Sequence, residues 1–497
     1  MAVLTRLPPQ PLNRLLNRLR ERLLTRLRDL ARTAGAARSG VTRSGAAGLA
    51  GAGVAAMAQF SLVVVVTRGT APETAGAFFA ATALCLTAAA VLRLDAGNGL
   101  VHVIARTRPS GHRPAPGRHG SDRPMPAYHL SGYIRAALLP VAALSLTVGV
   151  VVTLTAADPA LRVLAVALPF LACADVVVSA TRGFGAMRPT VLLDGVFQPV
   201  ARLVLVGGAV LAGVTSVPML TAAWALPSLP VLLLAWLWLR RRPLRAPDGP
   251  HVPDAPRIPD EPNVPDAPGT PSTVGVARDL WRHTWPRSLA AGIQAVFQRM
   301  DIVIVAALAG PAEAAVYTAA TRFKIVGQLA GQGLARAAQP RLVRAMAEGD
   351  LPRARALYRS STRVLVLLTW PIWLAYAAVA PWLLGVVFGE DYASGAPVAL
   401  VLAATMMLAT ACGMADVVLT SAGHTGSSLA HLAAAVATAV LLDVLLVPGL
   451  GALGAALGWA GGTAVKNLLP LWRIHRGYGL RPFGFPGHAA PATGGTR

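Results

Sequence analysis

The chain has 497 residues, of which 54% are hydrophobic and only 13% are charged, whereas soluble proteins average about 25% charged residues. This composition argues against a water-soluble enzyme. The formal net charge of +23 would indicate nucleic-acid binding in a soluble chain, so its meaning depends on where the charges lie.

Twelve apolar segments are long enough to cross a membrane, since a spanning helix needs about 20 mostly apolar residues. We therefore predict an all-α polytopic membrane protein. The predicted spans are residues 44–67, 76–94, 132–155, 161–181, 191–213, 219–239, 286–309, 314–337, 362–386, 396–420, 427–447 and 453–472.

The basic residues alternate between the loops that join these spans. The N-terminal segment, the even-numbered loops and the C-terminal segment together carry 33 of the 45 lysines and arginines, whereas the odd-numbered loops carry one, Arg68. Loops rich in lysine and arginine stay in the cytoplasm. Both termini are therefore predicted to be cytoplasmic, and the positive charge is expected to face the membrane surface rather than nucleic acid.

Two segments outside the spans have a distinctive composition. Residues 1–43 place leucine at three- and four-residue steps with arginine between them, which predicts a basic amphipathic helix on the inner leaflet. A helix that binds a partner or a largely disordered tail is the alternative. Residues 240–285 are rich in proline and predict an extended spacer.

The two halves of the sequence resemble each other. A shift of 239 residues aligns Gln59 with Gln298 and Pro72 with Pro311. Six helices per half make parallel repeats, which place the substrate path of a transporter between two lobes. We predict a cytoplasmic tail at 1–43, an N-terminal lobe at 44–239, a linker at 240–285, a C-terminal lobe at 286–472 and a cytoplasmic tail at 473–497.

Polar and charged side chains inside predicted spans are candidate site residues, because they are costly in a bilayer. Spans 191–213 and 314–337 both carry such residues four apart, on one helix face, and span 286–309 adds more. A basic cavity would suit an anionic headgroup such as a diphosphate. The candidates for the cavity between the lobes are Asp194, Gln198, Arg202, Gln298, Arg299, Asp301, Arg322, Lys324, Gln328 and Gln332.

The alternative is that these charges neutralise one another across helices, as Asp301 and Lys324 could. Asp443 is expected at the rim, near the outer end of its helix. The sequence shows no catalytic set, metal-ligand spacing or phosphate-binding loop, so we expect neither an enzyme nor a resident cofactor, and coupling to H⁺ or Na⁺ stays open. The residues with a structural or coupling role would be Asp175, Asp416 and Lys466.

Several short motifs follow one another along the chain: residues 65–78 (VVTRGTAPETAGAF), 298–301 (QRMD), 316–320 (VYTAA), 388–392 (FGEDY) and 448–456 (PGLGALGAA). Together they resemble polysaccharide flippases in the multidrug, oligosaccharidyl-lipid and polysaccharide exporter superfamily. The first motif resembles the first loop of these proteins, and the second and third resemble the start of their second lobe. The resemblance covers about residues 44–475.

The resemblance implies a V-shaped fold of two lobes that transfers polyprenyl-diphosphate-linked oligosaccharide from the inner to the outer leaflet of a bacterial plasma membrane. It implies a lipid-linked glycan and membrane lipids as ligands, and leaves open a glycan polymerase or glycosyltransferases as partners. The alternatives are a cation-coupled multidrug antiporter, a peptidoglycan lipid-precursor flippase and a non-transporting scaffold of glycan assembly. A membrane polymerase or glycosyltransferase is disfavoured by the short outer loops.

Overall fold

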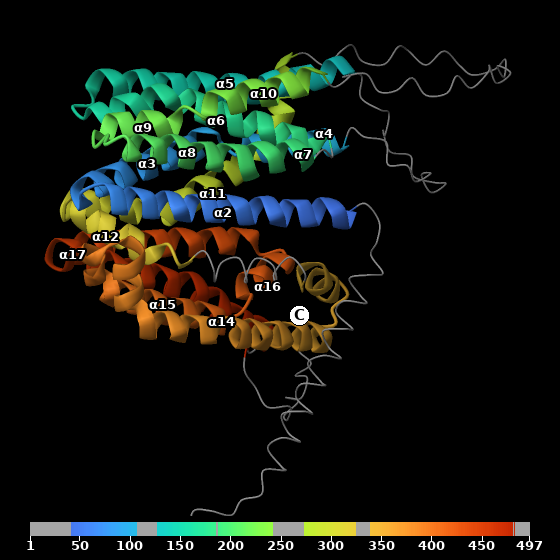
Figure 1. Ribbon diagram of the computed structural model, residues 1–497. Coiled ribbons are helices and arrows are strands. Elements are labelled where there is room, and N and C mark those ends of the chain that lie inside the picture. The colour runs from blue at the N-terminus through green and yellow to red at the C-terminus, as the bar shows by residue number, and fades with distance from the viewer. Residues whose placement is uncertain are drawn as a thin grey trace, which may run out of the picture.

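The computed structural model describes residues 41–106, 127–184, 187–241, 273–324, 338–480 and 482. Every regular element in these ranges is a helix, so the predicted all-α class is confirmed (Figure 1). Nearly all of the predicted N-terminal amphipathic helix, most of the proline-rich linker, and Gln328 and Gln332 lie outside the described residues.

The described helices of the N-terminal half are α2 (Val41–Gly69), α3 (Pro72–Leu92), α4 (Ala96–Arg106), α5 (Ala127–Thr155), α6 (Pro159–Gly183), α7 (Met187–Pro189), the π-helix η1 (Thr190–Phe197), α8 (Gln198–Leu211), α9 (Val217–Ala225) and α10 (Ser228–Arg241). Two of them, α3 and α6, start with a proline at the first position, where its missing N–H costs nothing.

The C-terminal half packs beside the first (Figure 1), and the halves meet where α3 contacts α11 and α12. The described elements of the C-terminal half are α11 (Thr273–Leu308), α12 (Pro311–Thr321), α14 (Leu351–Phe388), the 3₁₀ helix η2 (Glu390–Gly395), α15 (Ala396–Ala411), α16 (Ala415–Ser421) and α17 (Thr425–Tyr478).

Ten helical segments of the described residues are long and apolar enough to span a membrane. The last of them, Gly426–Tyr478, holds two helices, because Gly451 has non-helical backbone angles (φ 55°, ψ −132°) and reverses the chain. Glycines 454, 458 and 462 of the second arm lie directly against residues 435–447 of the first arm. Such small residues let two membrane helices approach closely. The count of twelve spans stays a prediction.

The start of α11 differs from the one expected. Helix α11 begins at Thr273, thirteen residues before the predicted span, because its first turns dock on the N-terminal lobe. Trp281 Nε1 donates to the Ala136 carbonyl at 3.1 Å and Ser288 Oγ donates to the Leu94 carbonyl. Tertiary packing of this kind supplies most of the stability of a helix.

The buried apolar side chains form one shared core and two separate ones. We call the outer end of the bundle the one that carries residues 70–71, 156–158 and 309–310, which the charge pattern predicts to face outside. In the outer half, Phe78 of α3 belongs to the same core as Phe388 of α14. In the inner half, one core fills the N-terminal lobe and includes Leu280 from the first turns of α11, and another, around Tyr358, fills the C-terminal lobe. The lobes are thus joined at their outer ends.

A glycine allows the closest contact between the lobes. A Cβ added to Gly76 on α3 would overlap the Pro311 carbonyl at the start of α12. We expect Gly76→Ala to cost about 1–3 kcal/mol through overpacking, measured as a lower thermal unfolding midpoint in detergent. The control is Gly208→Ala on α8, where nothing lies within 4 Å. A Gly76→Ala midpoint equal to that of the control would contradict this packing argument.

Candidate functional site

A cavity of about 90 Å³ lies where the two lobes meet. Gln59 of α2 and Thr82 of α3 line it together with Arg202 and Trp224, which come from α8 and α9 of the same lobe. The opposite lobe contributes Arg322, directly after α12. Two of the predicted cavity residues, Arg202 and Arg322, therefore reach one cavity although 120 residues separate them.

Trp224 holds Arg202 in place. The Arg202 Nε donates to the Trp224 carbonyl at 3.2 Å, and the guanidinium carbon lies 4.0 Å from the centre of the Trp224 ring. A cation over an indole face is a favourable electrostatic contact. Both contacts leave the terminal nitrogens of Arg202 available to an anion in the cavity.

Arg322 lies directly after the end of α12. Helix α12 ends at Thr321, and the Arg322 N–H donates to the Ala319 carbonyl, three residues back, at 3.2 Å. The Ala320 carbonyl accepts the Tyr376 hydroxyl of α14 at 2.8 Å. Of the span predicted over residues 314–337, residues 325–337 lie outside the described residues.

Neither cavity arginine forms an ion pair within the described residues. The Nε of Arg322 is buried and without a hydrogen-bond partner there, and its guanidinium carbon lies 6.0 Å from the ring of Phe79. A buried charge without a partner is costly. The cavity is therefore suited to bind an anion that both guanidinium groups can contact.

A second polar cluster lies within the C-terminal lobe. Asp301 of α11 is 6% exposed, and its Oδ2 accepts the Tyr317 hydroxyl at 2.6 Å. The Lys324 Nζ lies 3.9 Å from the same oxygen, so the expected pairing of Asp301 with Lys324 is present. The Lys324 ammonium also lies 5.2 Å from the centre of the Trp459 ring. This cluster places Lys324 against Asp301 rather than free in the cavity.

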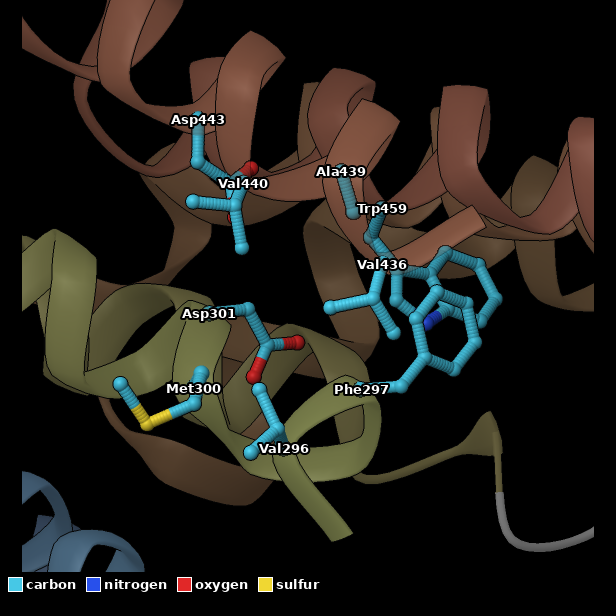
Figure 2. Close-up of a pocket in the computed structure, with 9 residues that line it drawn as sticks. All are labelled: Val296, Phe297, Met300, Asp301, Val436, Ala439, Val440, Asp443 and Trp459. Carbon is cyan, nitrogen blue, oxygen red and sulfur yellow. The ribbon is translucent and has the colours of Figure 1, made fainter. Parts of the chain in front are cut away.

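Asp443 faces Asp301 across a small cavity of about 10 Å³ between α11 and α17 (Figure 2). Its side chain is 2% exposed, and its Oδ1 has no hydrogen-bond partner among the described residues. The expectation that Asp443 is a rim residue is therefore wrong, because the second arm of α17 packs over it through Gly458. The cavity is about the size of one water-sized probe, so water or a small cation fits there.

The π-helix η1 separates Asp194 from the expected stripe. Residues four apart stack on one face of an α-helix, but the i→i+5 bonds of a π-helix put more residues in each turn. Asp194 lies within η1, whereas Gln198 begins α8. The cavity lining includes Arg202 but neither Asp194 nor Gln198. Asp194 and Gln198 are both partly buried.

The remaining candidates lie elsewhere. Asp175 forms an ion pair with Arg93 at the inner end of the N-terminal lobe. Asp416 is exposed and accepts the Ser428 hydroxyl at 2.6 Å. Three other candidates line neither described cavity: the exposed Gln298, the partly buried Arg299, and Lys466, whose Nζ donates to Gln294 Oε1 at 3.2 Å.

Sequence reasoning missed Trp224, Tyr317 and Tyr376, the aromatic residues that position the charged side chains. Each is an aromatic residue in an apolar helix, and no spacing to Arg202 or Asp301 marks it in the sequence. The described residues hold no group of three or more histidine, cysteine, aspartate or glutamate side chains that could bind a metal ion.

Residues 263–397 match a family model described as polysaccharide biosynthesis protein. Among solved structures, an inward-facing multidrug resistance MATE family transporter of the MOP superfamily matches at a TM-score of 0.62 and 16% identity, over 86% of this chain and 95% of the other. The chain has the fold of this superfamily. The match to a polysaccharide biosynthesis family and the shared fold agree with the resemblance that the sequence motifs predict.

Two further structures of the superfamily match over similar lengths. The lipid II flippase MurJ in an inward closed conformation has a TM-score of 0.59 and 10% identity, over 84% of this chain and 85% of the other. An outward-facing MATE family transporter has a TM-score of 0.53 and 16% identity, over 86% and 93%. No curated protein matches the chain significantly. The chain is thus a multi-pass membrane protein with a transporter fold.

Proposed function

We propose that this protein is a flippase that moves a polyprenyl-diphosphate-linked oligosaccharide from the inner to the outer leaflet of a bacterial plasma membrane. The observation that carries the proposal is the cavity between the lobes, with Arg202 from one lobe and Arg322 from the other. A diphosphate offers several acceptor oxygens, and planar guanidinium groups bind such oxygens in pairs. This charge complementarity supports a substrate with an anionic diphosphate headgroup.

The packing of the lobes supports alternating access. The outer core, which both lobes share, supports a molecule that is closed on the outside. In this state the diphosphate would bind Arg202 and Arg322 together, while the glycan occupies the space between the lobes and the lipid tail stays in the bilayer. If the outer ends moved apart, the two arginines would separate and would bind the anion together less tightly.

We further propose that a cation drives this cycle through Asp443. With all three groups ionised, Asp301, Asp443 and Lys324 would carry one net negative charge around a water-sized cavity. Uptake of H⁺ or Na⁺ would neutralise the unpartnered Asp443 carboxylate. A cation-coupled multidrug antiporter would share this cluster, but its organic cations would be repelled by the two arginines of the cavity between the lobes.

Native mass spectrometry of the gently purified protein tests the proposed substrate. We expect a bound lipid with the mass of a polyprenyl-diphosphate glycan, which Arg202→Gln removes. Detection of phospholipid alone, together with retention of added organic cations, would favour the antiporter instead. The mass of the released glycan would also identify its sugars.

A further inference from the structure

Arg68 is the only lysine or arginine in the odd-numbered loops, which are predicted to face outside. It lies in the last turn of α2, in the N-terminal lobe. Its side chain reaches the opposite lobe, where Nε donates to the Val387 carbonyl at 3.2 Å and Nη2 donates to the Val386 carbonyl. Arg68 thus forms a direct polar bond between the two lobes at their outer ends.

The bonded carbonyls belong to the last turn of α14, which ends at Phe388. The last four carbonyls of a helix lack an internal donor, and the helix dipole concentrates negative charge there. A guanidinium group is therefore well suited to this position. Arg68 caps a helix of the other lobe, so the cap exists only while the lobes touch.

Aromatic side chains also join the two lobes, on the inner side of Arg68. Phe60 of α2 packs on Phe323 at 5.5 Å and on Phe388 at 5.8 Å between ring centroids, and both partners belong to the other lobe. Phe323 directly follows the cavity residue Arg322. Opening of the outer end must therefore break the Arg68 bonds and separate Phe60 from its two partners.

We propose that Arg68 is a latch that holds the outer end closed while the path faces the cytoplasm. The inference rests on the proposed alternating access, but not on the identity of the substrate. Hydrogen bonds to a charged donor contribute more than neutral ones, so loss of the latch should shift the equilibrium between closed and open outer ends by about tenfold toward the open form.

The test measures how often the outer end opens. Cys85, Cys173 and Cys412 are replaced by alanine, and Gln59→Cys places a reporter in the cavity lining. A membrane-impermeant thiol reagent is added to intact cells, so that it reaches the reporter only through an open outer end. We expect Arg68→Gln to raise the labelling rate about tenfold.

Arg162→Gln is the matched control, since Arg162 Nε donates to the Ala156 carbonyl at 2.8 Å at the same end of the molecule but within one lobe. It should leave the labelling rate unchanged. Arg68→Lys keeps the charge but lacks the planar guanidinium group that donates to two carbonyls, so it should give a smaller rise in the labelling rate. This variant replaces Arg68→Gln if Arg68→Gln does not fold.

Equal labelling in the Arg68 variants and the Arg162 control would overturn the latch. A rise of the same size in Arg162→Gln would also overturn it, because any loss of an outer arginine would then suffice. Labelling needs no substrate, so failure of the cavity to bind a diphosphate lipid would leave this result unaffected.

Discussion

Arg202→Gln and Arg322→Gln should each weaken binding of a polyprenyl-diphosphate lipid by about tenfold to a hundredfold. The reason is that each substitution removes a charge-assisted hydrogen bond, for which the net contribution is about 1.5–3 kcal/mol, and 1.4 kcal/mol corresponds to tenfold. Binding to protein in nanodiscs measures this directly. The corresponding polyprenyl monophosphate should bind more weakly to the wild type and lose less in the variants, since it offers fewer oxygens.

The matched control is Arg240→Gln. Arg240 also lies over an indole ring, 5.2 Å from the centre of Trp236, but it is exposed at the inner end of α10 and away from the cavity. Its loss should leave diphosphate binding unchanged. If Arg202→Gln and Arg322→Gln bound the lipid as tightly as Arg240→Gln does, the anion-binding role of the cavity would be wrong.

Much of the fold follows from the sequence because a bilayer leaves few choices. Backbone polar groups cannot stay unpaired in lipid, so long apolar segments form helices. The same cost made the pairing of Asp301 with Lys324 predictable, and the two lie 3.9 Å apart. The sequence left two roles open for these charges, lining the cavity or neutralising one another. Arg322 lines the cavity, whereas Lys324 pairs with Asp301.

The end of α12 and the π-helix η1 were not predictable from local sequence. Helix α12 ends at Thr321 without a glycine or proline, because Tyr376 of α14 takes over the Ala320 carbonyl. The π-helix η1 lies where Gly195 packs against Gly51 of α2. Both features depend on helices distant in the chain, and both decide which polar side chains reach the cavity.

The burial of Asp443 was also not predictable from local sequence, because it depends on a helix that packs over it. Its distance from Pro448 along the chain suggested a place near the rim. Depth in the bundle instead depends on the returning arm of α17, whose Gly458 and Trp459 cover the carboxylate. A glycine four residues before Gly462 is a weak sign of close helix packing, and it does not reveal the partner.

Asp443→Asn should abolish the dependence of flipping on an imposed ion gradient while leaving lipid binding intact. An amide has nearly the same shape as a carboxylate but no negative charge to attract H⁺ or Na⁺. Since Asp443 is 2% exposed and its Oδ1 is unpartnered among the described residues, the neutral side chain also removes a desolvation cost. The variant should therefore unfold at the same temperature as the wild type or higher.

Asp301→Asn provides the contrast, because it leaves the Lys324 ammonium without its 3.9 Å partner and should destabilise the protein. Asp391→Asn is the control for Asp443→Asn, since Asp391 is exposed at the outer end. Flipping in proteoliposomes with a Na⁺ gradient at constant pH, and with a pH gradient in Na⁺-free buffer, identifies the ion. If Asp443→Asn responded to the gradients as Asp391→Asn does, the cation would act elsewhere. Loss of gradient dependence at full stability would instead show that a costly buried carboxylate is retained for coupling rather than for folding.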